Sequence, residues 1–237
     1  LALVQGLSFL LIFPLSAAEY DLYSPDELVH VHVWRDEAGV RFGVNYGRRP
    51  MVLESTLGLR GWDPGAFVSS EQRQSLSVWR TVYGERAAIP DNYRELTLRF
   101  QRMTLIFRAY EEGVAFRYRL EGKGRFELEG EDSEFRFPPG AMAWQENGTE
   151  GEYFRVPAAR LKDGCERPLT VDPGNGLWVS LAEAGQTNYP RMLLGARNDA
   201  VVTQLDGGVK GALPFETPWR VLVLGRRPGD LLERNYL

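Results

Sequence analysis

Hydrophobic and polar residues alternate with a period of two through most of the chain from Val29 onward. Val, Phe, Tyr, Thr and Leu recur at every second position, with Arg and Glu between them, in the segments 28–53, 93–122, 125–140, 168–181, 199–215 and 218–225. Such alternation is typical of strands with one buried and one solvated face. The pattern therefore predicts roughly ten or more strands in antiparallel sheets packed face to face, an all-β fold built as one large β-sandwich domain.

A helical pattern occurs near the end of the chain, in residues 228–235. Pro228 and Gly229 form a turn, Asp230 stands at a position suited to an N-cap, and two leucines follow it. We therefore expect a short helix or linker to begin here.

The composition is that of a globular protein with a sizeable core. The chain has 237 residues, 43% of them hydrophobic, and a formal net charge of -4. A chain of this length buries about 70% of its unfolded surface, so the core needs no disulfide or metal. The mild acidity and the scattered arginines are unlike the basic surface that binds nucleic acid, and we expect no nucleic-acid partner.

Residues 1–18 have the pattern of a secretory signal peptide, without an initiator Met. An apolar run from Leu7 to Phe13 precedes Pro14 and the small residues 16–18, as at a signal cleavage site. The alternative is a buried hydrophobic strand. The run is too short to span a membrane, and no later segment approaches a spanning length. We therefore expect an exported protein, periplasmic or secreted, with no membrane span and a mature chain that begins at Glu19.

The two histidines and the single cysteine are weak candidates for a metal or catalytic site. His30 and His32 are two residues apart on one predicted strand and face the same side. Such a pair can bind a metal, but the sequence names no third ligand, and polar outward positions of a half-exposed strand explain both residues. Cys165 stands in a polar turn and has no other cysteine to pair with, so we interpret it as structural or incidental.

Three glutamates lie close in sequence to two aromatic residues, a combination typical of active sites that hydrolyse sugars. Glu146, Glu150 and Glu152 lie close in sequence to Trp144 and Tyr153, and glycosidases use paired carboxyl groups. Spacing alone does not bring any two of them together, and a solvated acidic loop is the simpler interpretation.

The stretch 177–192 ends a predicted strand on an acidic residue. Leu181 belongs to the apolar face, and Glu183 follows between two alanines, with no cationic neighbour before Arg191. Either the strand end is exposed, or the carboxylate has a partner that this sequence does not contain.

Several stretches together resemble the amino-terminal domain of glycoside hydrolase family 97. The resemblance runs from about Ser24 to the last residue, in the family's order and spacing, and is carried by residues 23–59, 82–100, 105–120, 217–225 and 228–237.

The resemblance implies an exported bacterial α-glucosidase or α-galactosidase acting on α-linked oligosaccharides. In that family an amino-terminal β-sandwich, similar to mutarotase-like folds, packs on a (β/α)₈ barrel. Residues 19–227 would form the sandwich and 228–237 the start of the linker to the barrel. The catalytic acid and the base or nucleophile would lie on barrel loops beyond Leu237, so this chain alone would be inactive.

The resemblance also assigns a role to Glu183. The segment around it is similar to the family's His-Glu-Ala-Ala motif, whose Glu helps to bind calcium, although Ala182 and Gly185 replace the first and last residues. Calcium takes six to eight oxygen ligands, so Glu183 would be one ligand of a site that the barrel completes.

Two other classes of protein remain open. A free-standing carbohydrate-binding module would present coplanar exposed aromatic rings, for which the candidates are Trp34, Trp62, Trp79, Trp144, Trp178 and Trp219. A mutarotase-like epimerase would need a His and a Glu that converge in a cleft.

Overall fold

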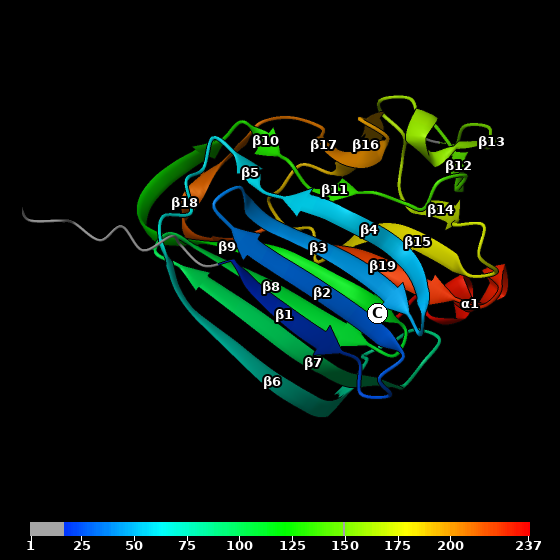
Figure 1. The fold of residues 1–237 in the computed structure, drawn as a ribbon, viewed down its shortest axis with the longest axis horizontal. Coiled ribbons are helices and arrows are strands. Elements are labelled where there is room, and N and C mark those ends of the chain that lie inside the picture. The colour runs from blue at the N-terminus through cyan, green and yellow to red at the C-terminus, as the bar shows by residue number, and fades with distance from the viewer. Residues whose placement is uncertain (1–16, 149) are drawn as a thin grey trace, which may run out of the picture.

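The computed structural model describes residues 17–148 and 150–237 and shows an almost entirely β-stranded protein (Figure 1). All strand pairings in this part of the chain are antiparallel. The predicted all-β antiparallel sandwich is confirmed.

Two sheets make up most of the fold. The smaller has the order β1 (Ala18–Tyr23), β2 (Val29–Asp36), β3 (Gly39–Tyr46) and β4 (Arg49–Leu57). The larger has ten strands in the order β13 (Phe154–Pro157), β12 (Met142–Gln145), β14 (Leu169–Asp172), β15 (Trp178–Ala184), β19 (Trp219–Gly225), β9 (Gly113–Leu128), β8 (Met103–Tyr110), β7 (Ala88–Phe100) and β6 (Phe67–Arg80), with β18 (Val209–Glu216) also paired to β9.

Short strands close one end of the sandwich. A three-stranded sheet has the order β11 (Glu134–Phe135), β17 (Ala200–Leu205) and β16 (Met192–Arg197), and β5 (Leu59–Arg60) pairs with β10 (Gly130–Glu131). The helical elements are the 3₁₀ turn η1 (Ala158–Arg160) and the helix α1 (Pro228–Glu233). Neither of these described helices is long and apolar enough to cross a membrane.

The main core lies between the smaller sheet and the middle of the larger one. Val31 on β2 is fully buried while His32 beside it is only half-buried on the other face, as the period of two requires. The buried ring of Phe42 on β3 lies 5.4 Å from Phe116 and 6.0 Å from Phe107, both on the larger sheet. Each such buried side chain contributes about 1.5–3 kcal/mol to folding.

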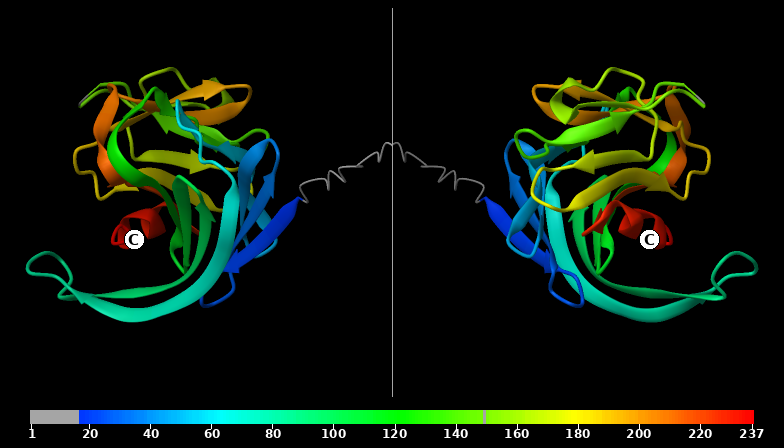
Figure 2. Two further views of the ribbon diagram at one scale, coloured as in Figure 1. Left: turned by 90° about the vertical axis from the view of Figure 1, so that its left-hand side faces the viewer. Right: turned by 90° about the vertical axis from the view of Figure 1, so that its right-hand side faces the viewer.

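The outer face of the larger sheet is concave. Figure 2 shows β6 and β7 extending beyond the sandwich and curving round the side on which α1 lies. A small apolar cluster of Ala115, Val221 and Val223 is packed there against Trp219 and Leu231. The larger sheet therefore buries part of both of its faces.

The tip of the β6–β7 hairpin meets the end of the chain on this concave side. The Arg86 side chain donates a hydrogen bond of 2.5 Å to the backbone oxygen of Glu233. Its guanidinium also lies 4.1 Å from the centre of the Tyr236 ring. The hairpin and the segment after β19 are thus held together by an arginine contact.

Three details differ from the sequence prediction. Strand β6 shows no alternation because nearly all of its residues are exposed on both faces. Its sequence therefore has no period-two pattern of apolar residues that would predict a strand. Strand β1 begins at Ala18, where the signal peptide was expected to end, and the rest of that predicted segment lies outside the described residues except for Ala17. Asp230 is not the N-cap of α1: Arg227 is, and the Asp230 carboxylate at N3 accepts hydrogen bonds from the backbone N–H groups of Arg226 and Arg227.

Candidate functional site

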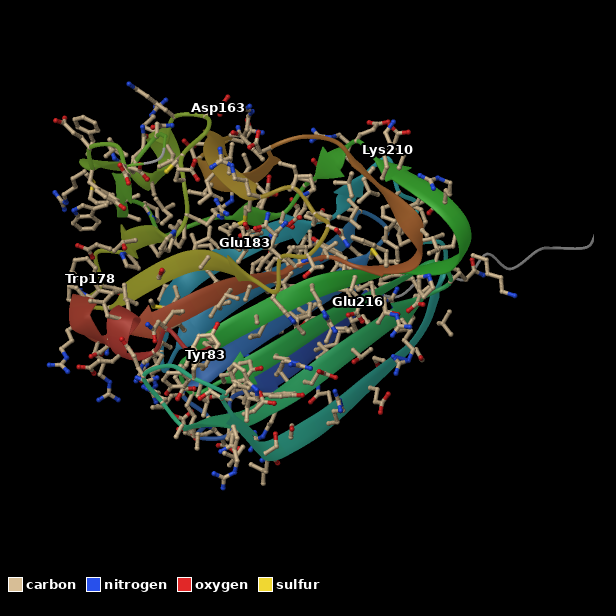
Figure 3. The ribbon with its side chains drawn as sticks, turned by 180° about the vertical axis from the view of Figure 1, so that it is seen from behind. Tyr83, Asp163, Trp178, Glu183, Lys210 and Glu216 are labelled. Carbon is tan, nitrogen blue, oxygen red and sulfur yellow. The ribbon has the colours of Figure 1, made fainter. Side chains whose placement is uncertain are left out.

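Glu183 lies near the end of β15, and its side chain points into the sandwich (Figure 3). Its position is in phase with Val179 and Leu181, which belong to the main core, whereas Ala184 packs on the opposite, concave face. The Glu183 side chain is only 4% exposed. The alternative of an exposed strand end therefore does not describe the Glu183 side chain.

Both carboxylate oxygens of Glu183 have partners within this chain. Arg220, directly opposite on β19, donates from Nη1 to Oε2 at 2.8 Å, and Arg167 forms an ion pair with Glu183, with 2.7 Å between Nε and Oε1. The backbone N–H of Met192 lies 3.1 and 3.2 Å from the two oxygens. Glu183 thus has partners within this chain, Arg220 through the pairing of β15 with β19 and Arg167 from the loop before β14. A further partner outside this sequence stays a prediction.

Arg220 is the centre of this arrangement. It binds Glu131 through two parallel contacts, Nε to Oε1 at 2.9 Å and Nη2 to Oε2 at 2.5 Å, and both side chains are at most 1% exposed. Burial alone would lower the pKa of Arg220, but the carboxylate of Glu131 raises it above its ordinary value. Ser133 donates a further hydrogen bond of 2.8 Å to Glu131. The bidentate geometry and the extra donor are what a buried ion pair needs to offset its desolvation.

The ion pairs continue from the core to the surface. Beyond Glu183 and Arg167, Glu166 binds Arg167 at 3.1 Å and Arg191 at 2.7 Å, and Arg191 binds Asp206 at 2.8 Å. Charges of opposite sign thus alternate from the buried Arg220 to the exposed Asp206. Each carboxylate in this charge chain has a guanidinium as its partner.

This environment does not fit a calcium ion. Calcium needs six to eight oxygen ligands at about 2.3–2.6 Å, but the Glu183 oxygens face two guanidinium groups and a backbone N–H. A cation at this carboxylate would have to displace Arg167 or Arg220. Within the described residues, Glu183 serves to compensate arginine charge, and its calcium role stays a prediction from the resemblance.

The acidic loop does not assemble a pair of catalytic carboxyl groups. Glu146 is buried and accepts a hydrogen bond of 2.8 Å from the backbone N–H of Gly151. Glu150 and Glu152 are exposed. The solvated-loop interpretation therefore describes the last two residues, whereas Glu146 has a structural contact inside the loop.

The tryptophans do not form a flat platform for sugars. Trp79 is 59% exposed, but Trp144 and Trp178 are half-buried, and their rings are tilted by 39° with 5.4 Å between centres. Trp62 and Trp219 lie under arginine side chains. These contacts assign most of the tryptophans to packing, and the described tryptophans do not form the coplanar exposed set expected of a sugar-binding module.

The histidine pair has a partner that sequence reasoning did not find. His30 and His32 face the same side of β2, as predicted, and Asp21 on β1 reaches both. Its Oδ1 lies 2.6 Å from His30 Nε2 and 2.7 Å from His32 Nδ1. Burial would raise the pKa of Asp21, but the hydrogen bonds from His32 and His30 hold it below its ordinary value. The register of β1 on β2 creates this contact, and the spacing of these residues in the sequence does not indicate it.

Cys165 is part of the core and not of a polar turn. Its side chain is fully buried, its backbone pairs with Leu194, and its thiol lies 3.4 Å from the backbone oxygen of Glu166. Burial raises the pKa of this thiol, so it is protonated at neutral pH. The structural interpretation of Cys165 agrees with its burial.

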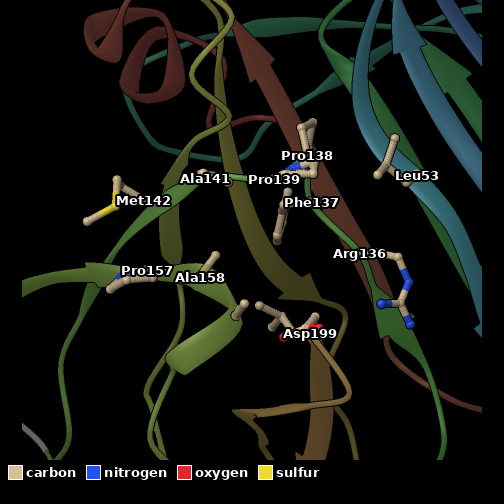
Figure 4. A pocket seen from close by; sticks show the side chains of 13 residues that line it. Leu53, Arg136, Phe137, Pro138, Pro139, Ala141, Met142, Pro157, Ala158 and Asp199 are labelled. Carbon is tan, nitrogen blue, oxygen red and sulfur yellow. The ribbon is translucent and has the colours of Figure 1, made fainter.

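A cavity of about 390 Å³ opens beside η1 (Figure 4). Its walls come mainly from apolar residues, among them Leu53, Phe137 and Pro138, with Arg136 and Asp199 at one side. Its lining brings together four separate parts of the chain, which is why no sequence motif reveals it. It has neither an aromatic platform nor a pair of acids.

The sequence matches a family model over nearly the whole described chain. The matching model is described as glycosyl-hydrolase 97 N-terminal, and it covers residues 22–237. The chain belongs to this family. The predicted resemblance to glycoside hydrolase family 97 is confirmed, and the Arg220–Glu183 charge chain is therefore part of a family 97 N-terminal domain.

Curated family 97 relatives agree with this assignment. A protein of Bacteroides thetaiotaomicron (strain ATCC 29148) named retaining alpha-galactosidase is 27% identical over 158 residues, which are 59% of this chain and 24% of that protein. A probable retaining alpha-galactosidase of Streptomyces bingchenggensis (strain BCW-1) is 28% identical over 207 residues, 77% of this chain and 31% of that protein. The chain thus spans between a quarter and a third of the length of the curated relatives it matches.

A solved structure shows the same fold. A glycoside hydrolase family 97 enzyme from Pseudoalteromonas sp. strain K8, in complex with acarbose, superposes with a TM-score of 0.80 at 23% identity. The match covers 90% of this chain and 36% of that one.

Proposed function

We propose that this chain is the N-terminal sandwich of a longer, exported α-glycosidase that acts on α-galactosides or α-glucosides. The observation that carries the proposal is the family 97 N-terminal match over residues 22–237. The names of the two curated relatives support α-galactosides as the first substrates to test. Export rests on the signal-like residues 1–18, and hydrolysis of aryl α-glycosides by the longer protein is the direct test of activity.

The sandwich would pack on the catalytic barrel through its concave face. Two observations support this face. Its apolar cluster and α1 already lie there, and the outer part of the β6–β7 hairpin exposes large apolar side chains: Leu76, Val78, Trp79, Val82 and Tyr83. Exposed apolar residues that gather on one part of a surface mark an interface more often than a free surface.

Hydrogen–deuterium exchange tests this packing. Backbone amides of β6 and of the β6–β7 turn should exchange several-fold more slowly in the longer protein than in the 237-residue chain, because the barrel covers them. Amides of β2 and β3 in the smaller sheet serve as the internal control and should exchange alike in both proteins. Equal exchange of β6 in the two proteins would contradict the docking proposal.

A calcium role for Glu183 requires a rearrangement that calorimetry can detect. We expect the 237-residue chain to bind Ca²⁺ no more tightly than about 10⁻³ M, because Arg220 and Arg167 occupy the carboxylate. In the longer protein, Glu183→Gln should weaken calcium-dependent hydrolysis if barrel carboxylates draw Glu183 away from Arg167. Micromolar binding by the short chain, or a variant with unchanged calcium dependence, would contradict this prediction.

A further inference from the structure

A cluster of two histidines and one aspartate lies on the outer face of the smaller sheet, far in sequence from the Arg220–Glu183 charge chain. Asp21 on β1 is paired in register with His32 on β2, and His30 is the next outward residue along β2. One ligand atom from each residue lies within 4.8 Å of the other two. Two His and one carboxylate that converge from neighbouring strands form the donor set of many transition-metal sites.

Neighbouring rings fix the orientation of both imidazoles. The His30 ring stacks on Tyr23 with 4.3 Å between centres and an interplanar angle of 6°. The His32 ring lies 4.2 Å from Trp34. Across the sheet from His32 stands Gly43, which adds no side chain to this face. The Trp34 ring lies over Gly43. The two imidazoles are therefore held with one nitrogen each directed at Asp21.

An outer carboxylate supports His32 in the way that metal-binding histidines are usually supported. His32 directs Nδ1 at Asp21, and its other nitrogen, Nε2, lies 3.4 Å from Glu19 Oε2. Metal-ligating histidines commonly donate the second ring N–H to a carboxylate, which fixes the tautomer and the ring orientation. Glu19 is placed for this role.

The charge balance of the cluster differs from that of Glu183. Each carboxylate of the Arg220–Glu183 charge chain has an arginine partner. Within the described part of the chain, the ion pairs of Glu19 and Asp21 are with His32 and His30 and include no Arg or Lys. Two carboxylates with no Arg or Lys partner would favour a cation, and the Asp21 side chain is half exposed and can adjust.

We propose that Asp21 Oδ1, His30 Nε2 and His32 Nδ1 form a binding site for a divalent transition metal, with zinc as the best-fitting ion. Zinc takes imidazole and carboxylate ligands at about 2.0–2.2 Å, and a water molecule fills the fourth position of a three-residue site. Asp21 Oδ1, now 2.6 and 2.7 Å from the two ring nitrogens, would move to about 3.3 Å from each in a tetrahedron built on those bond lengths. A bound metal would fasten the edge strand β1 to β2. This inference does not depend on the glycosidase proposal.

Titration of the chelator-treated 237-residue protein with ZnCl₂ tests the site. Calorimetry should show one equivalent of zinc bound at micromolar or tighter affinity, and zinc should raise the melting temperature by mass action. Asp21→Asn and His32→Gln should each lower the affinity by at least about 10-fold, and Glu19→Gln by about 10–100-fold. Glu37→Gln, an exposed acid in the β2–β3 turn, is the matched control and should leave the affinity unchanged.

Cobalt gives a second readout that does not depend on the stability of the variants. Co²⁺ bound by wild-type protein should show the intense visible absorption of a four-coordinate site, and zinc should remove it. Zinc binding no tighter than millimolar, a weak six-coordinate cobalt spectrum, or affinity that Asp21→Asn, His32→Gln and Glu19→Gln all leave unchanged would overturn the proposal.

Discussion

Replacing Arg220 by methionine is expected to lower the free energy of unfolding by about 3–5 kcal/mol, the loss typical of breaking a buried ion pair from one side. Arg220 is fully buried and supplies both contacts to the Glu131 carboxylate and one to Glu183. Methionine fills much of the same space but has no charge. Glu131 would then be left ionised in the core, or would have to take up a proton, with a hydroxyl contact from Ser133. Urea unfolding followed by circular dichroism measures the change.

Two further variants separate charge compensation from packing. Arg227→Met removes an arginine that also binds a carboxylate, Asp230, but whose side chain is 68% exposed, so it should change stability far less than Arg220→Met. Adding Glu131→Gln to Arg220→Met removes the uncompensated charge and should restore part of the loss. If Arg220→Met were as mild as Arg227→Met, or if the double variant were less stable still, the role of Arg220 as a buried counter-charge would be refuted.

The period of two predicted most of the fold because most strands have one wet and one dry face. Strands β2, β3, β8 and β19 lie within segments where the alternation is visible, and β7 and β9 lie largely within them. Strand β6 was not predicted because it is exposed on both faces along nearly all its length. Its place in the sheet is fixed by backbone pairing with β7, which leaves no mark on the sequence.

The candidate site was only partly predictable, because its contacts also depend on backbone pairing between strands. The motif around Glu183 singled out the correct residue but not its partners, since Arg220 becomes its neighbour through the pairing of β15 with β19. Arg167 is brought to the same carboxylate from the loop before β14. Likewise Asp21 joins the histidines through the register of β1, a strand that lies outside the segments of visible alternation. Contacts between strands depend on register, and short-range patterns do not encode it.

The 237-residue chain alone is expected to show no glycosidase activity. Hydrolysis of a glycosidic bond uses two carboxyl groups about 5–9.5 Å apart that flank the bond. The buried carboxylates Glu131 and Glu183 are compensated by arginines, and Glu146 is engaged with the Gly151 backbone. None of these three buried acids is therefore free for this chemistry, and we expect the loss relative to the longer protein to be complete.

The claim that this chain is the non-catalytic sandwich of a longer glycosidase is tested most directly by rates of hydrolysis. Aryl α-galactosides and α-glucosides are offered to the 237-residue chain and to the longer protein, side by side. We predict turnover by the longer protein, and for the 237-residue chain a hydrolysis rate equal to the rate in buffer alone. Turnover by the short chain that disappears in Glu150→Gln or Glu152→Gln would place the active site in the sandwich and contradict the account, as would a longer protein that hydrolyses neither substrate.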